Sequence, residues 1–462
     1  MSDALACVIL AAGQSKRMKT KRSKALHAIC GAPVLARVLR TLRELQASPI
    51  VTVISADSDD VATLAQANGS ETVVQDPPLG TGHAALQARS VLGGFQGTVL
   101  LTCVDIPLLR VETLQALVEH HHSTQAAATI LTAEYDDPTG YGRIVRGRDG
   151  SVRAIVEHRD ADDSQRAIRE INSSVYCFRS PLVFELAARL SADNDQGEQY
   201  LTDVIATMVA AGERVEALIA DDPQEIAGIN NRVQLAEAEA ALRDRIRQRL
   251  MLDGVTLVDP ETIYIDDDVE VGRDTIIQPC TFISGRTVIG EDCEIGPHAT
   301  VRDCQMGDRV VIRHGTFMMD SRVGDEATVG PFAHVRAGCR IGPKARAGSY
   351  VEMKAADLGE GVKAGHVSYL GDVQIGAGAN IGAGAITCNY DGARKHRTII
   401  GERAFIGSNV SLVAPVTIGD GAYVGAGSTI TKDVPPGALA VARGKQKEIE
   451  GWTPPKEGDA GR

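Results

Sequence analysis

The chain has 462 residues, of which 44% are hydrophobic and 23% are charged, the composition of an ordinary globular protein. That length is too great for one hydrophobic core, so two or three domains are expected. The formal net charge of −12 argues against a nucleic-acid partner, because a dedicated nucleic-acid binder normally presents a basic face.

Membrane and disulfide signals are both missing from the sequence. The apolar run from Val8 to Ala12 is far shorter than the roughly 18 residues that a membrane-spanning helix needs, and no later segment approaches that length. The nine cysteines include no Cys-x-x-Cys pair, which fits reduced thiols better than a disulfide framework. We therefore expect a cytoplasmic protein with no membrane partner.

Residues 1–232 alternate apolar runs with amphipathic stretches. The runs predict buried strands at residues 7–10, 50–54, 98–104 and 127–132, with helices between them. This alternation is typical of an α/β fold with a doubly wound sheet, which binds its ligand beyond the carboxyl ends of its strands.

Two features lie at such strand ends. The turn Leu10–Met18 holds small residues around Gly13 followed by two basic residues. It matches neither G-x-G-x-x-G nor a P-loop, and a plain strand-to-helix turn is the alternative interpretation. Asp105 follows the strand at 98–104, where a carboxylate suits a magnesium ion that carries substrate phosphates.

Two helical stretches are interpreted as having no chemical role. Residues 233–253 place Leu235, Leu242 and Ile246 at near-helical spacing, which predicts a solvated linker helix. The run His120–His122 is interpreted as a solvated helix face and not as a metal site.

The second half repeats an aliphatic residue every six positions. Seven aliphatic residues from Ile265 to Val301 keep this spacing without a break, and the same spacing recurs in later segments as far as Ile430. A spacing of six keeps side chains on one face of an extended chain and not of a helix. A glycine often follows, as at Gly272 and Gly290, and indicates a corner with little room. The pattern predicts a parallel β-helix over about residues 254–433, with a β-sandwich as the alternative; the spacing does not set the handedness.

The six-residue spacing is interrupted between Ile381 and Ile400, where Cys388–His396 forms a polar insertion. Polar loops on rigid scaffolds commonly carry function. Lys354, His366 and Asn380 add polar groups within three coils of the insertion. We therefore expect a second site on the coil.

Several motifs together resemble the bacterial bifunctional N-acetylglucosamine-1-phosphate uridyltransferase and glucosamine-1-phosphate N-acetyltransferase family. The resemblance covers nearly the whole chain, with its motifs in order. The motifs are Leu10–Gly13 with Arg17 and Lys24, Gln75 with Leu79–His83, Asp137–Arg143, Val156–His158, Glu170–Asn172, Gly228–Arg232 and Lys363–Asp372.

The resemblance implies a Rossmann-like nucleotidyltransferase domain at residues 1–232, a helical linker at 233–253, and a left-handed β-helix acetyltransferase domain with a C-terminal arm at 254–462. It also implies a homotrimer formed through the β-helix. The substrates would be glucosamine 1-phosphate, N-acetylglucosamine 1-phosphate, UTP and acetyl-CoA, with Mg²⁺ as cofactor.

For uridyl transfer, the resemblance implies that Arg17 and Lys24 hold phosphates and act in catalysis, while Asp105 and Asn230 hold Mg²⁺. The remaining implied nucleotide-binding and sugar-binding residues are Leu10, Ala11, Ala12, Gly13, Gln75, Gly80, Thr81, Cys103, Val104, Gly142, Glu157 and Asn172.

For acetyl transfer, the resemblance implies that His366 is the general base, since a histidine near neutral pKa suits removal of the amine proton. Lys395 and Arg443, which lie off the regular hexads, are expected to reach a neighbouring chain of the trimer. The implied sugar-phosphate residues are Arg336, Lys354, Tyr369 and Asn380; those along acetyl-CoA are Ala383, Lys395, Ser408, Ala426 and Arg443; Asn389 and Tyr390 contact one or both ligands.

The chain departs from the family pattern at four positions, all in its first half. Ser15 and Ser174 replace glycines, Ser23 replaces a proline, and Val104 replaces a glycine. Two rival functions were weighed: a nucleotidyltransferase whose β-helix only oligomerises or regulates, and a non-catalytic scaffold. His366 and the polar insertion argue against the first, and the joint presence of Asp105, Lys24 and Asn230 argues against the second.

Overall fold

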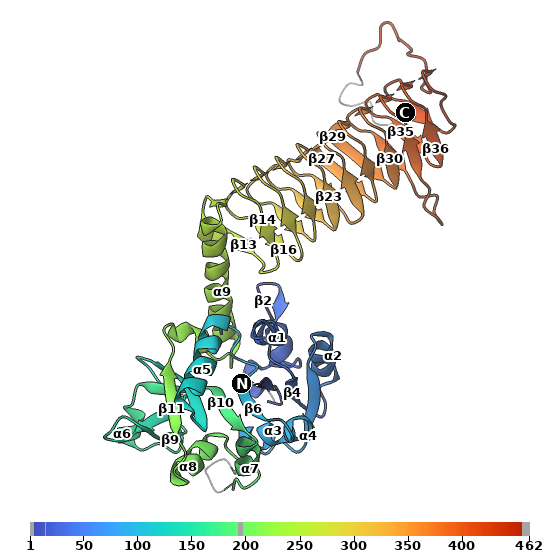
Figure 1. The fold of residues 1–462 in the computed structure, drawn as a ribbon. Coiled ribbons are helices and arrows are strands. Elements are labelled where there is room, and N and C mark those ends of the chain that lie inside the picture. Colours follow the sequence, from blue (N-terminus) through green and yellow to red (C-terminus); the bar gives the residue numbers. More distant parts are fainter. Residues whose placement is uncertain (1–3, 14, 193–196, 455–462) are drawn as a thin grey trace. The chain divides into compact units, whose positions relative to one another are not determined.

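The chain folds into two compact units, Met1–Arg245 (unit 1) and Ile246–Arg462 (unit 2). The computed structural model describes residues 4–13, 15–192 and 197–454 (Figure 1). Among these described residues, no helix combines the length and the apolar character needed to cross a membrane.

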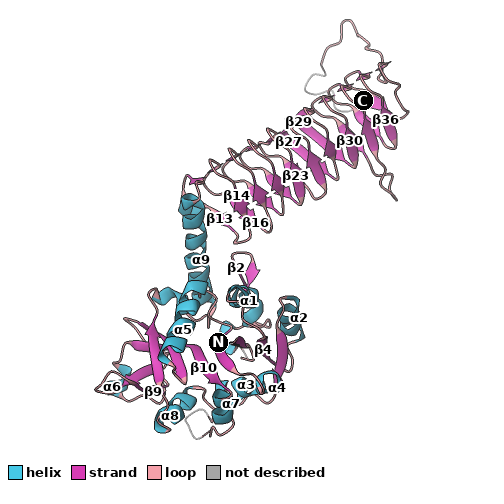
Figure 2. Ribbon diagram, viewed as in Figure 1, coloured by secondary structure: helices cyan, strands magenta, loops and turns pink. Residues whose placement is uncertain are grey.

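Unit 1 is built on one mixed sheet with the strand order β11-β7-β10-β6-β1-β4-β5 (Figure 2). Strands β6, β1, β4 and β5 are parallel neighbours, and β10 runs antiparallel between β6 and β7. The doubly wound prediction is confirmed. The strands are β1 (Leu5–Leu10), β4 (Ile50–Ser55), β5 (Glu71–Gln75), β6 (Gly97–Cys103), β7 (Ala128–Glu134), β8 (Arg143–Arg146), β9 (Val152–Val156), β10 (Glu170–Ser180) and β11 (Val215–Ile219), with β2 (Ala28–Ile29) and β3 (Ala32–Pro33) as a separate hairpin.

Helices pack on this sheet, and the core lies between the sheet and the helices. Val8, Val99 and Phe178 are fully buried on β1, β6 and β10, as expected for strands covered on both faces. The helices are α1 (Val34–Glu44), α2 (Asp59–Ala67), α3 (Thr81–Gln87), α4 (Arg89–Leu92), α5 (Val111–Thr124), α6 (Asp163–Arg166), α7 (Leu182–Ala187), α8 (Thr202–Ala210) and α9 (Arg232–Leu252).

The histidine run on α5 is not the solvated face that the sequence predicts. His121 is buried and its Nδ1 lies 2.9 Å from the Thr129 hydroxyl, while His122 Nε2 lies 2.8 Å from the Thr98 hydroxyl. The prediction was wrong because three adjacent residues span most of a helical turn, so at least one must face the sheet.

Helix α9 is also more than a solvated spacer. Arg245 near its middle donates to the Leu108 carbonyl at 2.6 Å within unit 1, and Arg247 donates to the Pro260 carbonyl at 2.5 Å within unit 2. Leu242, Ile246 and Leu250 are buried. Arg245 therefore attaches the helix to unit 1, and Arg247 attaches it to unit 2.

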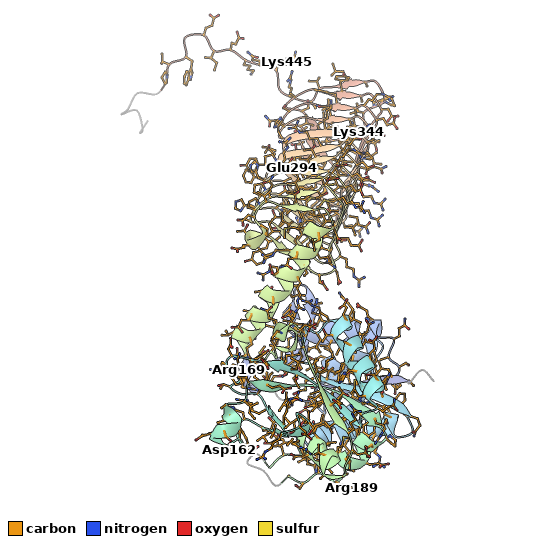
Figure 3. The ribbon with its side chains drawn as sticks, turned by 60° about the vertical axis from the view of Figure 1, so that its left-hand side comes forward. Asp162, Arg169, Arg189, Glu294, Lys344 and Lys445 are labelled. Atoms are coloured by element: carbon orange, nitrogen blue, oxygen red, sulfur yellow. The ribbon has the colours of Figure 1, made fainter. Side chains whose placement is uncertain are left out.

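Unit 2 is the left-handed parallel β-helix implied by the resemblance. It runs from β12 (Thr256–Leu257) to β39 (Leu439–Ala440) in strands of mostly two or three residues; β27 (Arg346–Lys354) and β29 (Lys363–Gly371) are longer. The strands stack in three ladders, one for each side of the coil. Polar side chains such as Glu294 and Lys344 point outward (Figure 3).

The register between coils measures the repeat directly. Glu270 pairs with Val288, so one coil takes 288 − 270 = 18 residues, or three hexads. Some later coils take 17, as where Arg346 pairs with Lys363, and others again take 18, as where Phe405 pairs with Tyr423. Where Val373 pairs with Thr398 the difference is 398 − 373 = 25, which locates the polar insertion inside a single coil.

The glycines that follow the aliphatic residues serve close packing between coils. A Cβ added to Gly290 would lie 2.5 Å from the Gly307 carbonyl oxygen, so no side chain fits there. The left-handed corner falls two residues later, at Asp292 with φ 56°. The aliphatic residues are buried, among them Ile277, Ile295 and Val329 at 0% exposure. Stacking of identical rungs is therefore the source of the core.

Candidate active sites

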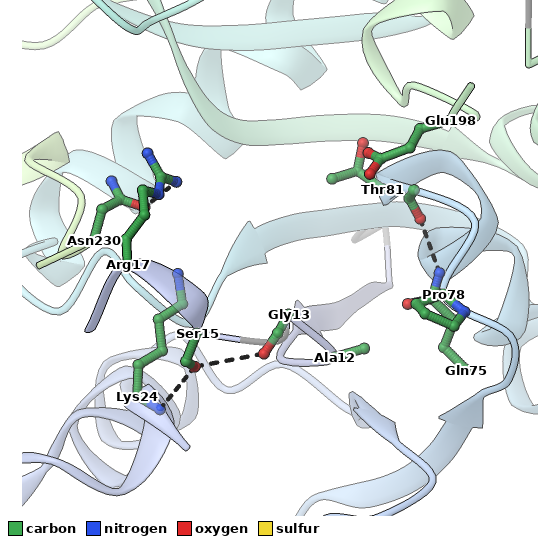
Figure 4. A pocket seen from close by; sticks show the side chains of 11 residues that line it. Ala12, Gly13, Ser15, Arg17, Lys24, Gln75, Pro78, Thr81, Glu198 and Asn230 are labelled. Carbon is green, nitrogen blue, oxygen red and sulfur yellow. Dashed lines mark hydrogen bonds between the residues drawn. The ribbon is translucent and has the colours of Figure 1, made fainter. Parts of the chain in front are cut away.

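A cavity of about 490 Å³ opens at the carboxyl ends of β1 and β5 in unit 1 (Figure 4). Gln75 at the end of β5 donates through Nε2 to the Gly80 carbonyl at 2.9 Å and so holds the loop before α3. The Thr81 hydroxyl accepts from the Leu201 backbone amide at 3.0 Å. The cavity is lined by Ala12, Gly13, Ser15, Arg17, Lys24, Gln75, Pro78, Gly80, Thr81, Glu198 and Asn230.

A second cavity, of about 240 Å³, lies at the ends of β6 and β10 and shares Arg17 and Asn230 with the first. Thr202 donates to the Glu157 carboxylate at 3.3 Å on one wall. The two cavities therefore adjoin at a pair of polar side chains. The second is lined by Arg17, Cys103, Asp105, Ile106, Thr139, Gly140, Tyr141, Gly142, Glu157, Asn172, Ser173, Ser174, Ile226, Gly228, Asn230 and Gln234.

Two side-chain contacts cross this junction. Arg17 donates through Nη2 to Asn230 Oδ1 at 2.7 Å, and Lys24 Nζ forms an ion pair with Asp105. In each pair a cationic side chain donates to an oxygen that accepts. Because Lys24 and Asp105 are both mostly buried, at 18% side-chain exposure, their attraction is less screened than on an open surface.

Burial shifts two of the groups in the second cavity. It raises the pKa of the Glu157 carboxyl above its ordinary value of 4.5, against the Thr202 hydrogen bond that lowers it. Burial, followed by the charge of Asp105, raises the pKa of the Cys103 thiol to about 12. The thiol therefore stays protonated and is no nucleophile at neutral pH.

Three of the four departures from the family pattern, Ser15, Ser174 and Ser23, have local explanations. Ser15 and Ser174 have φ of 52° and 63°, the left-handed conformation that glycine adopts most readily, which accounts for glycine at these positions in the family. The Ser15 hydroxyl accepts from the Lys24 amide at 3.1 Å. Ser23 has φ −55°, which proline also adopts, and Val104 is buried at 2% exposure.

The residues at the junction fit a hard divalent cation that is held mainly by a phosphate ligand. Asp105 and Asn230 offer a carboxylate and an amide oxygen, which are the donors that Mg²⁺ accepts. In the described ranges, no three His, Cys, Asp or Glu residues gather closely enough to make a site from protein alone. Such a site needs the substrate's oxygens.

Unit 2 carries a groove of about 870 Å³ along one side of the coil. The register places Arg346, Lys363 and Asn380 above one another, followed by the stacked rings of Phe405 and Tyr423, whose centroids are 5.2 Å apart. The groove is lined by Thr328, Lys344, Ala345, Arg346, Lys363, Gly365, His366, Asn380, Ile381, Gly382, Ala383, Phe405, Gly407, Ser408, Tyr423, Val424, Gly425, Ala426 and Leu439.

A separate basic cluster lies near the end of β27. The adjacent Lys395 lowers the pKa of Lys354, with Arg336 acting in the same direction and Asp372 against it. Asn389 donates through Nδ2 to Asp372 at 2.5 Å. Adjacent ammonium groups repel each other, so this cluster is suited to an anion.

The structure gathers most of the predicted residues of unit 1 and divides those of unit 2. Leu10, Ala11 and Val104 are buried and do not line either cavity of unit 1, whereas the other predicted residues do. On the coil, His366, Asn380, Ala383, Ser408 and Ala426 line the groove. The predicted residues outside its lining are Arg336, Lys354, Tyr369, Asn389, Tyr390, Lys395 and Arg443.

Some lining residues were missed in the sequence. Lys363 and Arg346 stand 17 and 34 residues before Asn380, so a coil-by-coil count would have found them. Glu198 and Ser173 follow no period and gave no signal. Arg443 donates to the Ala426 carbonyl at 2.8 Å within its own chain, and its expected reach to a neighbour stays a prediction.

Two family models match separate parts of the chain. A MobA-like NTP transferase domain matches residues 7–208, and a bacterial transferase hexapeptide of six repeats matches residues 397–432. The chain is thus a nucleotidyltransferase joined to a hexapeptide-repeat transferase, as its fold and its cavities indicate.

Relatives match both parts at once. A "Bifunctional protein GlmU" of Geobacillus sp. (strain WCH70) is 48% identical over 96% of this chain and 96% of its own length. Another, of Streptomyces avermitilis, is 50% identical over 97% of this chain and 93% of its own. A solved structure of UDP-glucose pyrophosphorylase complexed with UDP-glucose has a TM-score of 0.43 and 14% identity, covering 52% of this chain and 99% of that one.

The chain belongs to the GlmU family. It is a bifunctional enzyme of UDP-N-acetylglucosamine synthesis, with the pyrophosphorylase activity of a uridyltransferase and with glucosamine-1-phosphate N-acetyltransferase activity.

Glu157→Gln should stabilise unit 1 at neutral pH. Below pH 4.5 the carboxyl is neutral in both states and contributes nothing; above it the unfolded chain ionises first, so folding is increasingly disfavoured until the folded carboxyl also ionises. Glutamine carries no such cost. Thermal unfolding should show a higher Tm for the variant at pH 7 and no gain near pH 4. A variant less stable than the parent at pH 7 would contradict the buried-carboxyl account.

Proposed function

We propose that the two cavities of unit 1 hold the two substrates of uridyl transfer. The first, with Ala12, Gly13, Gln75, Gly80 and Thr81, takes UTP; the second, with Gly142, Glu157 and Asn172, takes N-acetylglucosamine 1-phosphate. The observation that carries this proposal is that the cavities adjoin at Arg17 and Asn230. The reacting phosphates would meet there.

The chemistry at the junction needs alignment more than a base. The sugar phosphate is already an anionic nucleophile, and its attack on the α-phosphorus forms the new phosphoanhydride bond while pyrophosphate leaves. Arg17 and Lys24 supply the positive charge that offsets the repulsion between the two anions. Their partners Asn230 and Asp105 would hold Mg²⁺, which neutralises developing charge when bound.

Asp105→Asn should abolish uridyl transfer and leave acetyl transfer unchanged. The amide has the same shape but no charge, so it loses both the cation site and the partner of Lys24. Pyrophosphate release and CoA release, measured on the same preparation, report the two activities. Asp222→Asn, which removes an ion pair with Arg110 and Arg245 outside both cavities, is the matched control and should keep both activities. Survival of uridyl transfer at ordinary magnesium levels would show that Asp105 is no ligand.

For acetyl transfer, we propose that the groove of unit 2 takes acetyl-CoA and that His366 accepts the proton of the attacking amine. His366 is exposed and lines the groove together with Gly365 and Asn380, so a ligand in the groove can reach it. The amine attacks the thioester carbonyl, the C–N bond forms, and the CoA thiolate leaves. The stacked Phe405 and Tyr423 and the small Ala383, Gly407 and Ala426 leave an elongated space for the coenzyme.

His366→Ala should remove acetyl transfer alone. Loss of a general base typically costs about 100-fold to 10,000-fold, and raising the pH should partly restore the rate because the amine then loses its proton in solution. His334→Ala, on the same β-helix but outside the groove, is the control. A His366→Ala enzyme with near-normal CoA release at neutral pH would assign proton transfer to another group.

We also propose that the chain is a homotrimer whose acetyl site is shared between neighbouring coils. The predicted ligand residues form two groups on one chain: the His366 groove and the Arg336, Lys354 and Lys395 cluster. A three-sided coil has little concavity, so a pocket is made most easily where two coils lie side by side. Cyclic closure would bring the groove of one chain to the basic cluster of the next.

Mixed trimers test the sharing. Chains carrying His366→Ala and chains carrying Lys395→Ala should each be inactive, because each lacks one contributor to every site. With random mixing in a head-to-tail ring, roughly a quarter of all sites combine an intact His366 with an intact Lys395, so about a quarter of acetyl transfer should return. The measurement is CoA release from the whole mixture, after the two tags have shown that mixed trimers form. No return of activity would place both residues in one chain's site.

The remaining assignments complete the proposal. Residues 1–232 carry uridyl transfer, 233–253 the linker, and 254–462 acetyl transfer, and acetylation precedes uridylation. A cytoplasmic location is supported by the cysteines, since none of the nine is in a disulfide and all of them are among the described residues.

A further inference from the structure

Strand β10 carries a bulge at the wall of the sugar cavity. Asn172 pairs with Thr132 and Tyr176 with Ile130, so three residues on β10, numbers 173 to 175, face Leu131 alone. Ser173 provides hydrogen bonds to backbone groups in this bulge. Its hydroxyl donates to the Leu131 carbonyl at 2.6 Å and accepts from the Val175 amide at 3.1 Å. Bulges beside active sites commonly redirect a side chain. Here the bulge brings Tyr176 back toward Asn172.

The bulge holds the Asn172 amide at both ends. The Ser174 backbone amide donates to Asn172 Oδ1 at 3.1 Å, and Asn172 Nδ2 donates to the Tyr176 hydroxyl oxygen at 2.7 Å. A backbone N–H can only donate, so the atom facing Ser174 must be the oxygen and the atom facing Tyr176 the nitrogen. The contacts themselves therefore determine which way round the amide lies.

Tyr176 acts on the cavity only through Asn172. Asn172 lines the cavity together with Glu157 and Gly142, whereas Tyr176 does not line it and is 2% exposed. The Tyr176 ring stacks on Phe178 with centroids 5.3 Å apart, so the hydroxyl is presented by a rigid support. One amide proton and one Oδ1 lone pair of Asn172 stay available to a ligand.

We propose that Tyr176 is a positioning residue for the amino-sugar phosphate in uridyl transfer. Together with the Ser174 amide, it holds the Asn172 amide in the orientation that presents an acceptor and a donor to the sugar's polar groups. This inference rests on the proposed role of Asn172 as a sugar ligand. Without the hydroxyl, the Ser174 amide alone holds the side chain, so orientations that present its polar atoms poorly to the sugar become accessible.

Tyr176→Phe should raise the KM for N-acetylglucosamine 1-phosphate by about fivefold, because one hydrogen bond of about 1 kcal/mol holds the amide. The KM for UTP, the uridyl kcat and acetyl transfer should change little. Thr129→Val removes another buried hydroxyl contact of the same sheet, to His121, and controls for a general loss of stability.

A double-mutant cycle with Asn172→Ala separates the possible outcomes. If Asn172→Ala raises the sugar KM and Tyr176→Phe adds nothing to it, the positioning role is supported. If Tyr176→Phe leaves the sugar KM unchanged while Asn172→Ala raises it, or raises it equally in the Asn172→Ala background, the inference is wrong and the proposed function stands. If Asn172→Ala has no effect on the sugar KM, the proposed role of Asn172 is itself wrong. Tyr176→Met, which also lacks the hydroxyl, replaces Tyr176→Phe in the cycle if the latter fails to fold.

Discussion

The binding of phosphate-bearing substrates by a strongly acidic chain is the constraint on which both sites depend. With a net charge of −12, the chain must concentrate cations locally wherever two anions have to meet. Unit 1 places Arg17 and Lys24 together, and each donates to an oxygen of Asn230 or Asp105 in the same site. Unit 2 does so with the cluster around Lys354 and the column through Lys363.

The two scaffolds deliver these cations by different means. In unit 1 the carboxyl ends of parallel strands meet at one edge, so residues far apart in sequence, such as Lys24 and Asp105, become neighbours. In unit 2 the constant length of a coil places residues 17 or 18 positions apart above one another, so a column such as Arg346 and Lys363 is a matter of counting. The insertion at residue 389 changes that count once and adds Lys395 to the basic cluster.

The fold could be predicted because it depends on periodicities, whereas parts of the site could not. The spacing of six at Ile265–Val301 follows from burial on one face of each rung, and the glycines that follow the aliphatic residues mark close contacts between coils that leave no room for a side chain. The bulge after Asn172 depends on hydrogen bonds of Ser173 with Leu131 and Val175, which no spacing encodes. His121 was misjudged because sequence does not show which part of a helix faces the sheet.

We propose that one chain carries two independent sites and that the product of acetyl transfer is the substrate of uridyl transfer. The most direct test supplies purified protein with glucosamine 1-phosphate, acetyl-CoA, UTP and magnesium, and follows all sugar species over time by mass spectrometry. The account predicts N-acetylglucosamine 1-phosphate first, then UDP-N-acetylglucosamine with equal amounts of CoA and pyrophosphate, and no nucleotide sugar when acetyl-CoA is left out. Formation of UDP-glucosamine ahead of any acetylated sugar phosphate would contradict it.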